Sequence, residues 1–176
     1  MIGLLWYFLN FYQDGKANND LRVARYLPVA ESQAGKQMRY GEHTDYTGFT
    51  FLWRSADNGL QCLHPDSRGS KWIDIPTQTE HKDALIVNAG DLIQRWTNDY
   101  WISNVHRVLG CESADDDKDK HYPMSIVYFT GPHEDTKIRV LTNSEKIQQQ
   151  GPVKKQYEEE ITAGKHLWHK INASNE

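Results

Sequence analysis

Short runs of alternating or mostly apolar residues, separated by turn signals, follow one another along most of the chain. The expected strands are 21–26, 38–45, 49–54, 60–63, 71–75, 84–88, 103–110 and 124–130. Turns between them are marked by segments such as Asp57-Asn58-Gly59, whose residue types favour tight reversals. Many short strands at this spacing predict a mainly β sandwich or barrel. The chain has no glycine-rich phosphate loop between a strand and a helix, which disfavours a doubly wound nucleotide-binding fold.

Helices are expected at a few places outside these runs. Residues 92–96 show no alternation and predict a single helical turn, whereas 142–150 and 153–163 predict longer helices. The apolar start, Ile2 to Tyr12, predicts a helix that packs on a sheet. It is too short to span a bilayer.

Composition narrows the class of protein. A chain of 176 residues with 38% hydrophobic and 25% charged residues suits one domain with its own core. A net charge of −4 offers no general attraction to nucleic acid or to an anionic membrane. Cys62 and Cys111 lack the spacing of a zinc knuckle or a redox pair, which favours a reducing, cytoplasmic setting.

Candidate chemistry lies in His43-Thr44-Asp45 and, much further along, in His106. On a strand, residues two apart point to the same face, so His43 and Asp45 are expected to project together. A neighbouring strand can add His106. Two imidazoles and one carboxylate form the facial triad of non-haem Fe(II) oxygenases, with the opposite face of the metal open.

Other interpretations of these residues remain open at this point. A His-x-Asp pair alone is more often an ordinary turn or sheet-edge pair. The same ligand types hold catalytic zinc, although the His-Glu-x-x-His helix of many zinc hydrolases is absent. A jelly-roll protein that retains a metal without catalysing a reaction is a third possibility.

A longer series of motifs favours iron. Its members, in order, are Leu21 to Tyr26, Gly41 to Leu52, Gly59 to Gln61, Lys71 to Ile73, Leu85 to Asp91, Gln94 to Asn98 and Ser103 to Val108. Together they resemble the catalytic region of the isopenicillin N synthase-like branch of the Fe(II)/2-oxoglutarate-dependent dioxygenases. The resemblance covers residues 20–165, nearly the whole chain.

The resemblance implies a double-stranded β-helix, or jelly roll, with flanking helices. It divides the chain into a jelly-roll core at 21–142, a C-terminal helical segment at 143–176, and residues 1–20, expected to be a helix left from the family's N-terminal region. It implies Fe(II) held by His43, Asp45 and His106, with 2-oxoglutarate as cosubstrate. The implied partners are dioxygen and a small organic substrate that is hydroxylated, desaturated or cyclised, with no nucleic acid and no membrane.

The family binds the far carboxylate of 2-oxoglutarate with an Arg-x-Ser motif on a late strand. Ser125 matches the serine, but Pro123 stands at the arginine position and offers neither a charge nor a backbone donor. This departure puts the cosubstrate in question. Tyr26 matches a family tyrosine that meets a carboxylate, and the cations expected to compensate are Lys120, His121 and Arg54.

Strand parity and the resemblance place Leu52, Leu60 and Val108 in the substrate pocket, although core packing competes for each of them. Trp53 and Trp96 are expected in the core. The histidines expected on the surface are His64, His81, His133, His166 and His169. The alternative to an oxygenase is a catalytically silent jelly-roll binding protein that retains the metal site.

Overall fold

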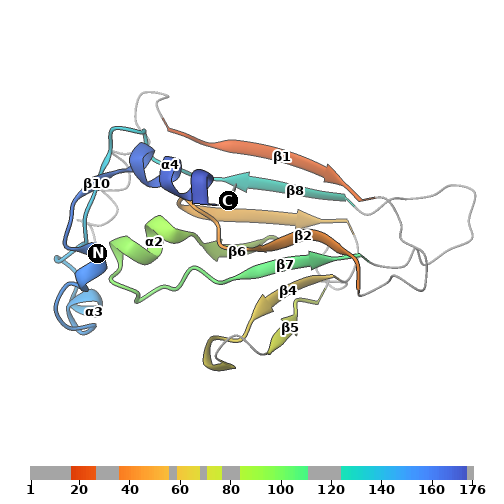
Figure 1. The fold of residues 1–176 in the computed structure, drawn as a ribbon, viewed down its shortest axis with the longest axis horizontal. Helices are drawn as coiled ribbons and strands as arrows, with labels where there is room; N and C mark the ends of the chain where they lie inside the picture. Colours follow the sequence, from red (N-terminus) through yellow and green to blue (C-terminus); the bar gives the residue numbers. More distant parts are fainter. Residues whose placement is uncertain are drawn as a thin grey trace, which may run out of the picture.

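Two four-stranded antiparallel sheets form the body of the protein in this computed structural model (Figure 1). The structure describes residues 17–26, 36–55, 59–67, 71–76, 84–110 and 124–173. The apolar start and the segment with Lys120, His121 and Pro123 lie outside these ranges, so the expectations about them stay predictions.

The order of the strands defines the topology. The first sheet has the order β1 (Asp20–Arg25), β8 (Met124–Phe129), β3 (Phe49–Arg54) and β6 (Ile86–Ala89). The second has the order β2 (Met38–His43), β7 (His106–Leu109), β4 (Leu60–Leu63) and β5 (Trp72–Asp74). The antiparallel pairs β1–β8, β2–β7, β3–β6 and β4–β5 are those of one long hairpin rolled into two sheets. This is a jelly roll, as predicted.

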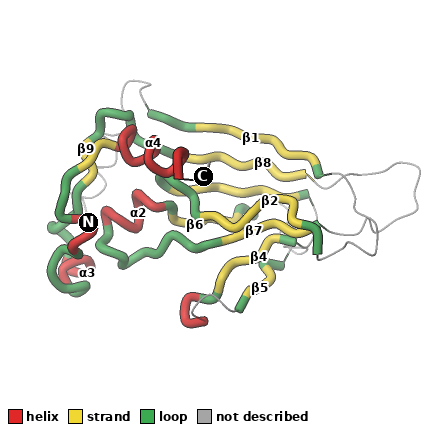
Figure 2. Tube along the Cα trace, in the orientation of Figure 1, coloured by secondary structure: helices red, strands yellow, loops and turns green. Residues whose placement is uncertain are grey.

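Short elements surround the sheets. The helices are α2 (Asp91–Trp96), α3 (Glu145–Gln148) and α4 (Ala163–Ala173), with 3-10 turns at Pro65–Ser67 and Lys155–Tyr157. A third, two-stranded sheet pairs β9 (Lys137–Ile138), which is labelled in Figure 2, with β10 (Ile161–Thr162). In the described part of the chain, no helix is long and apolar enough to cross a membrane.

The C-terminal prediction was partly wrong. The helix expected at 153–163 is instead a 3-10 turn followed by β10, and α4 begins only at Ala163. Ile161 pairs with Ile138 of β9, and its β-branched side chain suits that pairing. The helix expected at 142–150 is shorter than predicted and spans Glu145–Gln148.

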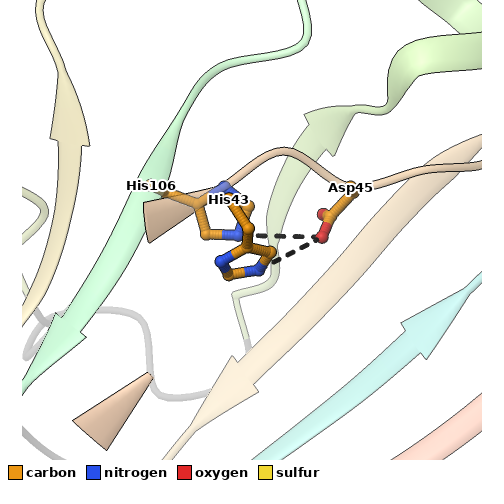
Figure 3. A group of neighbouring side chains, drawn as sticks. All are labelled: His43, Asp45 and His106. Carbon is orange, nitrogen blue, oxygen red and sulfur yellow. Dashed lines mark ion pairs between the residues drawn. The ribbon is translucent and has the colours of Figure 1, made fainter. Parts of the chain in front are cut away.

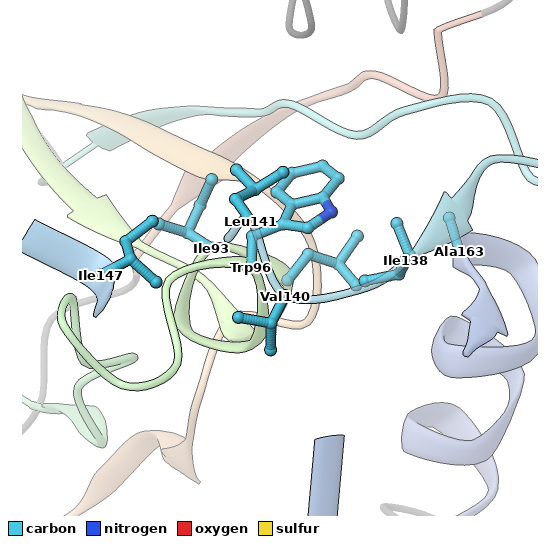
Figure 4. Close-up of a cluster of buried hydrophobic side chains, with 8 residues drawn as sticks. Ile93, Trp96, Ile138, Val140, Leu141, Ile147 and Ala163 are labelled. Carbon is cyan, nitrogen blue, oxygen red and sulfur yellow. The ribbon is translucent and has the colours of Figure 1, made fainter. Parts of the chain in front are cut away.

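The main buried apolar cluster lies among the helices (Figure 4), at one end of the jelly roll (Figure 1). It consists of Leu92, Ile93, Trp96, Ile138, Val140, Leu141, Ile147 and Ala163. Trp96 is fully buried, as expected for a core residue, whereas Trp53 on β3 is only half-buried and belongs to no core cluster. Residues of both sheets line a cavity instead.

Candidate metal centre

His43 and His106 face each other across two paired strands. They are Cα partners at the end of β2 and the start of β7, and their ring centroids lie 4.2 Å apart (Figure 3). The Nε2 atoms of His43 and His106 lie 3.8 and 3.7 Å from Oδ1 of Asp45. The ligating atoms of the three residues all lie within 4.8 Å of one another, so one metal ion can reach all of them.

Asp45 reaches this point by a different route from the predicted one. The strand β2 ends at His43, so strand parity does not aim the Asp45 carboxylate. Instead, the start of α2 holds the loop that follows β2. The N–H groups of Gly90, Asp91 and Leu92 donate to the carbonyls of Gly48, Asp45 and Thr47, at 2.7, 2.8 and 3.1 Å.

The carboxylate of Asp45 is itself held in one orientation. The Thr50 hydroxyl and the Asn88 amide both donate to Oδ2 at 2.6 Å, and Asp45 is only 5% exposed. Thr50 and Asn88 are partners on β3 and β6, so paired strands place both donors. Oδ1 is left facing the histidines. Thr50 and Asn88 were not among the predicted site residues, although Thr50 shares a strand face with the predicted pocket residue Leu52.

Hydrogen bonds select the tautomer of each imidazole. Nδ1 of His43 donates to the carbonyl of Gly41 at 2.8 Å, and Nδ1 of His106 donates to that of Asn104 at 3.0 Å. Each Nε2 then presents its lone pair toward Asp45, the state that binds a metal. Burial lowers the pKa of His43, more than the bond to Gly41 raises it, and the neighbouring His106 lowers it further.

The three groups make a poor ion-pair network but a good ligand set. The separations of 3.7 and 3.8 Å exceed hydrogen-bonding distance. Bonds of roughly 2.0–2.2 Å from a metal to nitrogen or oxygen fit between such donors. Two imidazoles and one carboxylate oxygen also leave positions open on an iron ion. The residues present therefore fit Fe(II).

The triad lies in the wall of a cavity of about 720 Å³ between the two sheets. The predicted residues Tyr26, Ser125, Leu52, Leu60 and Val108 all line this cavity. The hydroxyls of Tyr26 and Ser125 lie 3.1 Å apart, and Leu60 is the partner of Val108 on adjacent strands. Their roles toward a cosubstrate or substrate remain predictions.

The helix α4 forms another part of the cavity wall. Leu167 and Ile171, one helical turn apart, line the cavity. His166 donates through Nε2 to the carbonyl of Tyr46 at 3.0 Å, and Lys170 pairs with Asp91 at 2.7 Å. The expectation that His166 is a surface residue was wrong. No individual helix was predicted over Ala163–Ala173, and this helix, α4, places His166 beside the loop after Asp45.

Partial burial of His166 lowers its pKa, and the nearby Asp91 carboxylate only partly offsets this effect. The unfolded chain then binds a proton more readily than the folded protein. Stability from this group is present above about pH 6.5, the ordinary histidine value, and is lost as the pH falls through the folded pKa.

We expect His166→Gln, which keeps a donor for Tyr46, to lose less stability than the wild type between neutral and mildly acidic pH. Urea unfolding at several pH values measures this, and parallel curves for the two proteins would contradict it.

Known proteins resemble the chain in both sequence and structure. The family profile of the 2OG-Fe(II) oxygenase superfamily matches residues 18–132. The 2-oxoglutarate-dependent dioxygenase htyE of Aspergillus rugulosus is 35% identical over 127 residues, which are 70% of this chain and 37% of that protein. The 2-oxoglutarate-Fe(II) type oxidoreductase ppzD of Metarhizium rileyi is 38% identical over 116 residues, 65% of this chain and 31% of that protein.

Among solved structures, a full-length Neurospora crassa protein in complex with alpha-KG and thymine superimposes with a TM-score of 0.71. It is 31% identical, and the match covers 96% of this chain and 47% of that one. The chain thus spans less than half the length of these relatives. The family profile covers the strands of the jelly roll and all three residues of the triad. The chain belongs to the 2OG-Fe(II) oxygenase superfamily.

Proposed function

We propose that this chain carries the catalytic region of an Fe(II)- and 2-oxoglutarate-dependent dioxygenase that oxidises a small organic molecule, with His43, Asp45 and His106 as the metal ligands. The observation that carries the proposal is the orientation of the three ligating side chains by their hydrogen bonds. Both imidazoles present Nε2, and Thr50 and Asn88 occupy the other oxygen of Asp45. A facial set of this kind holds iron while leaving room for other ligands.

The residues around the triad position the reactants and limit the access of water. Bound Fe(II), 2-oxoglutarate and dioxygen supply the oxidising power, as cofactors do in such enzymes. The hydroxyls of Tyr26 and Ser125 offer hydrogen bonds to a carboxylate, and Ser125 is only 3% exposed. Membership of the superfamily supports this use of 2-oxoglutarate.

The walls of the cavity support a substrate with an apolar body. Leu52, Leu60 and Val108 line it from the two sheets, and Leu167 and Ile171 line it from α4. The N. crassa structural relative is in complex with alpha-KG and with thymine, a small heterocycle. Hydroxylation, desaturation and ring closure all suit such a site. The proposal includes a cytoplasmic location, since two cysteines without motif spacing suit a reducing compartment.

Anaerobic titration with Fe(II), with and without 2-oxoglutarate, tests the proposal. We expect one equivalent of Fe(II) to bind, and a visible absorption band to develop only when 2-oxoglutarate is added. On admission of oxygen together with a substrate, succinate is expected to form. Absence of the band would contradict the use of this cosubstrate. Binding of both Fe(II) and 2-oxoglutarate with no succinate formation would favour the silent binding protein instead.

A further inference from the structure

Binding of 2-oxoglutarate is part of the function proposed above. It would require the cavity to accommodate the charge of the second carboxylate. The assignment of a cationic partner below rests on that function. In that function the keto-acid end of the molecule would bind the metal, and its second carboxylate would enter a cavity with many apolar residues. An ionised carboxylate in such surroundings needs a cationic partner. The position at which the family carries an arginine is occupied here by Pro123.

Among the residues that the structure describes, the cavity walls contain the arginines Arg22, Arg39 and Arg54 and no lysine. Arg22 is a weak candidate because it is exposed and paired at 2.7 Å with Asp20, on the same strand. Arg39 lies on β2, in the other sheet from Ser125. Arg54, the last residue of β3, lies next to the hydroxyl pair.

The position of Arg54 follows from the strand register. Its Cα partner on β8 is Ser125, whose hydroxyl contacts that of Tyr26. Thr50, Leu52 and Arg54 alternate along one face of β3, and all three line the cavity. Thr50 contacts the ligand Asp45 at one end of this row, and Arg54 lies roughly 13 Å along the strand at the other.

The guanidinium of Arg54 extends from one sheet to the other. Its Nη2 donates to the carbonyls of Ile75 and Pro76, at 3.0 and 3.1 Å, just after β5 in the second sheet. These two carbonyls fix the direction in which the planar group points. A guanidinium carries five N–H donors and is well shaped to bind a carboxylate.

We propose that Arg54, together with Ser125 and Tyr26, binds the second carboxylate of 2-oxoglutarate. The positive charge of the site then comes from β3 rather than from the start of β8. Arg54 acts as a binding residue for the cosubstrate and takes the place of the arginine that Pro123 replaces.

Two ligands that differ in one group test this assignment. Anaerobic Fe(II)-loaded protein is titrated with 2-oxoglutarate and with 2-oxopentanoate, in which a methyl group replaces the second carboxylate. We expect the wild type to prefer 2-oxoglutarate by about 10- to 100-fold, the scale of a charge-assisted hydrogen bond. In Arg54→Met this preference is expected to disappear, while the dissociation constant for 2-oxopentanoate stays close to the wild-type value. The readout is binding, so turnover is not needed.

Matched variants complete the design. Arg22→Met and Arg39→Met remove the other two cavity arginines and are expected to keep the preference. Arg54→Gln, which keeps an amide donor for the Ile75 and Pro76 carbonyls, is expected to lose it, and it serves if Arg54→Met fails to fold. If Arg54→Gln keeps the preference, or if Arg39→Met alone removes it, the assignment to Arg54 is wrong while the proposed function stands. A wild type that never binds 2-oxoglutarate overturns both.

Discussion

His106→Ala is expected to abolish Fe(II) binding at micromolar concentrations of the metal. Loss of an outer partner of a metal ligand costs roughly 10- to 100-fold in affinity, and loss of one ligand out of three must cost more. The remaining pair, His43 and Asp45, cannot form a facial triad. Anaerobic Fe(II) titration of folded protein, with the fold checked by circular dichroism, measures the effect.

His169→Ala is the control for this experiment. His169 is an exposed histidine on α4, and its replacement is expected to leave Fe(II) affinity unchanged. If His106→Ala retains stoichiometric Fe(II) binding, the metal site lies elsewhere in the protein.

Gly90→Ala is expected to damage stability and metal binding together. A Cβ at this position would lie 2.5 Å from the carbonyl oxygen of Thr47 and 2.6 Å from that of Gly48, and both are backbone atoms. Relieving such overlap costs about 1–3 kcal/mol. The same carbonyls belong to the loop that holds Asp45, so Fe(II) affinity is expected to fall by roughly 10- to 100-fold. Chemical denaturation and Fe(II) titration measure the two effects.

Gly41→Ala provides a matched glycine control. A Cβ at Gly41 would meet nothing within 4 Å, although Gly41 lies two residues before the proposed ligand His43 on β2. We expect this change to be neutral or slightly stabilising, because glycine weakens a strand interior. Equal losses in the two variants would show that the close approach at Gly90 is unimportant.

The sequence predicted most of the strands because their signals are local. The strands β3 and β4 end where predicted, since turn residues interrupt their apolar runs. The two-residue strands β9 and β10 are too short for any period to appear, and only their pairing with each other defines them. The error over 153–163 followed from this, and it concealed the place of α4 in the cavity wall.

In the candidate site too, the local features could be predicted and the contacts made only on folding could not. The types and spacing of His43, Asp45 and His106 indicated a metal centre, and the structure brings the three side chains together. The way in which Asp45 is held could not be predicted. Its support comes from Thr50 and Asn88 on two strands and from the start of α2, groups that are brought together only by folding.

The main apolar cluster lies at the end of the jelly roll rather than between its sheets. Different residues therefore pack the core and line the cavity. Close packing around Trp96 supports the fold, whereas Leu52, Leu60 and Val108 line the cavity between the sheets. The cavity residues can change in size with little effect on the packing around Trp96. On the proposed function, the same scaffold can therefore acquire new substrates in evolution by resizing its cavity, while the proposed metal ligands and the packed end stay as they are.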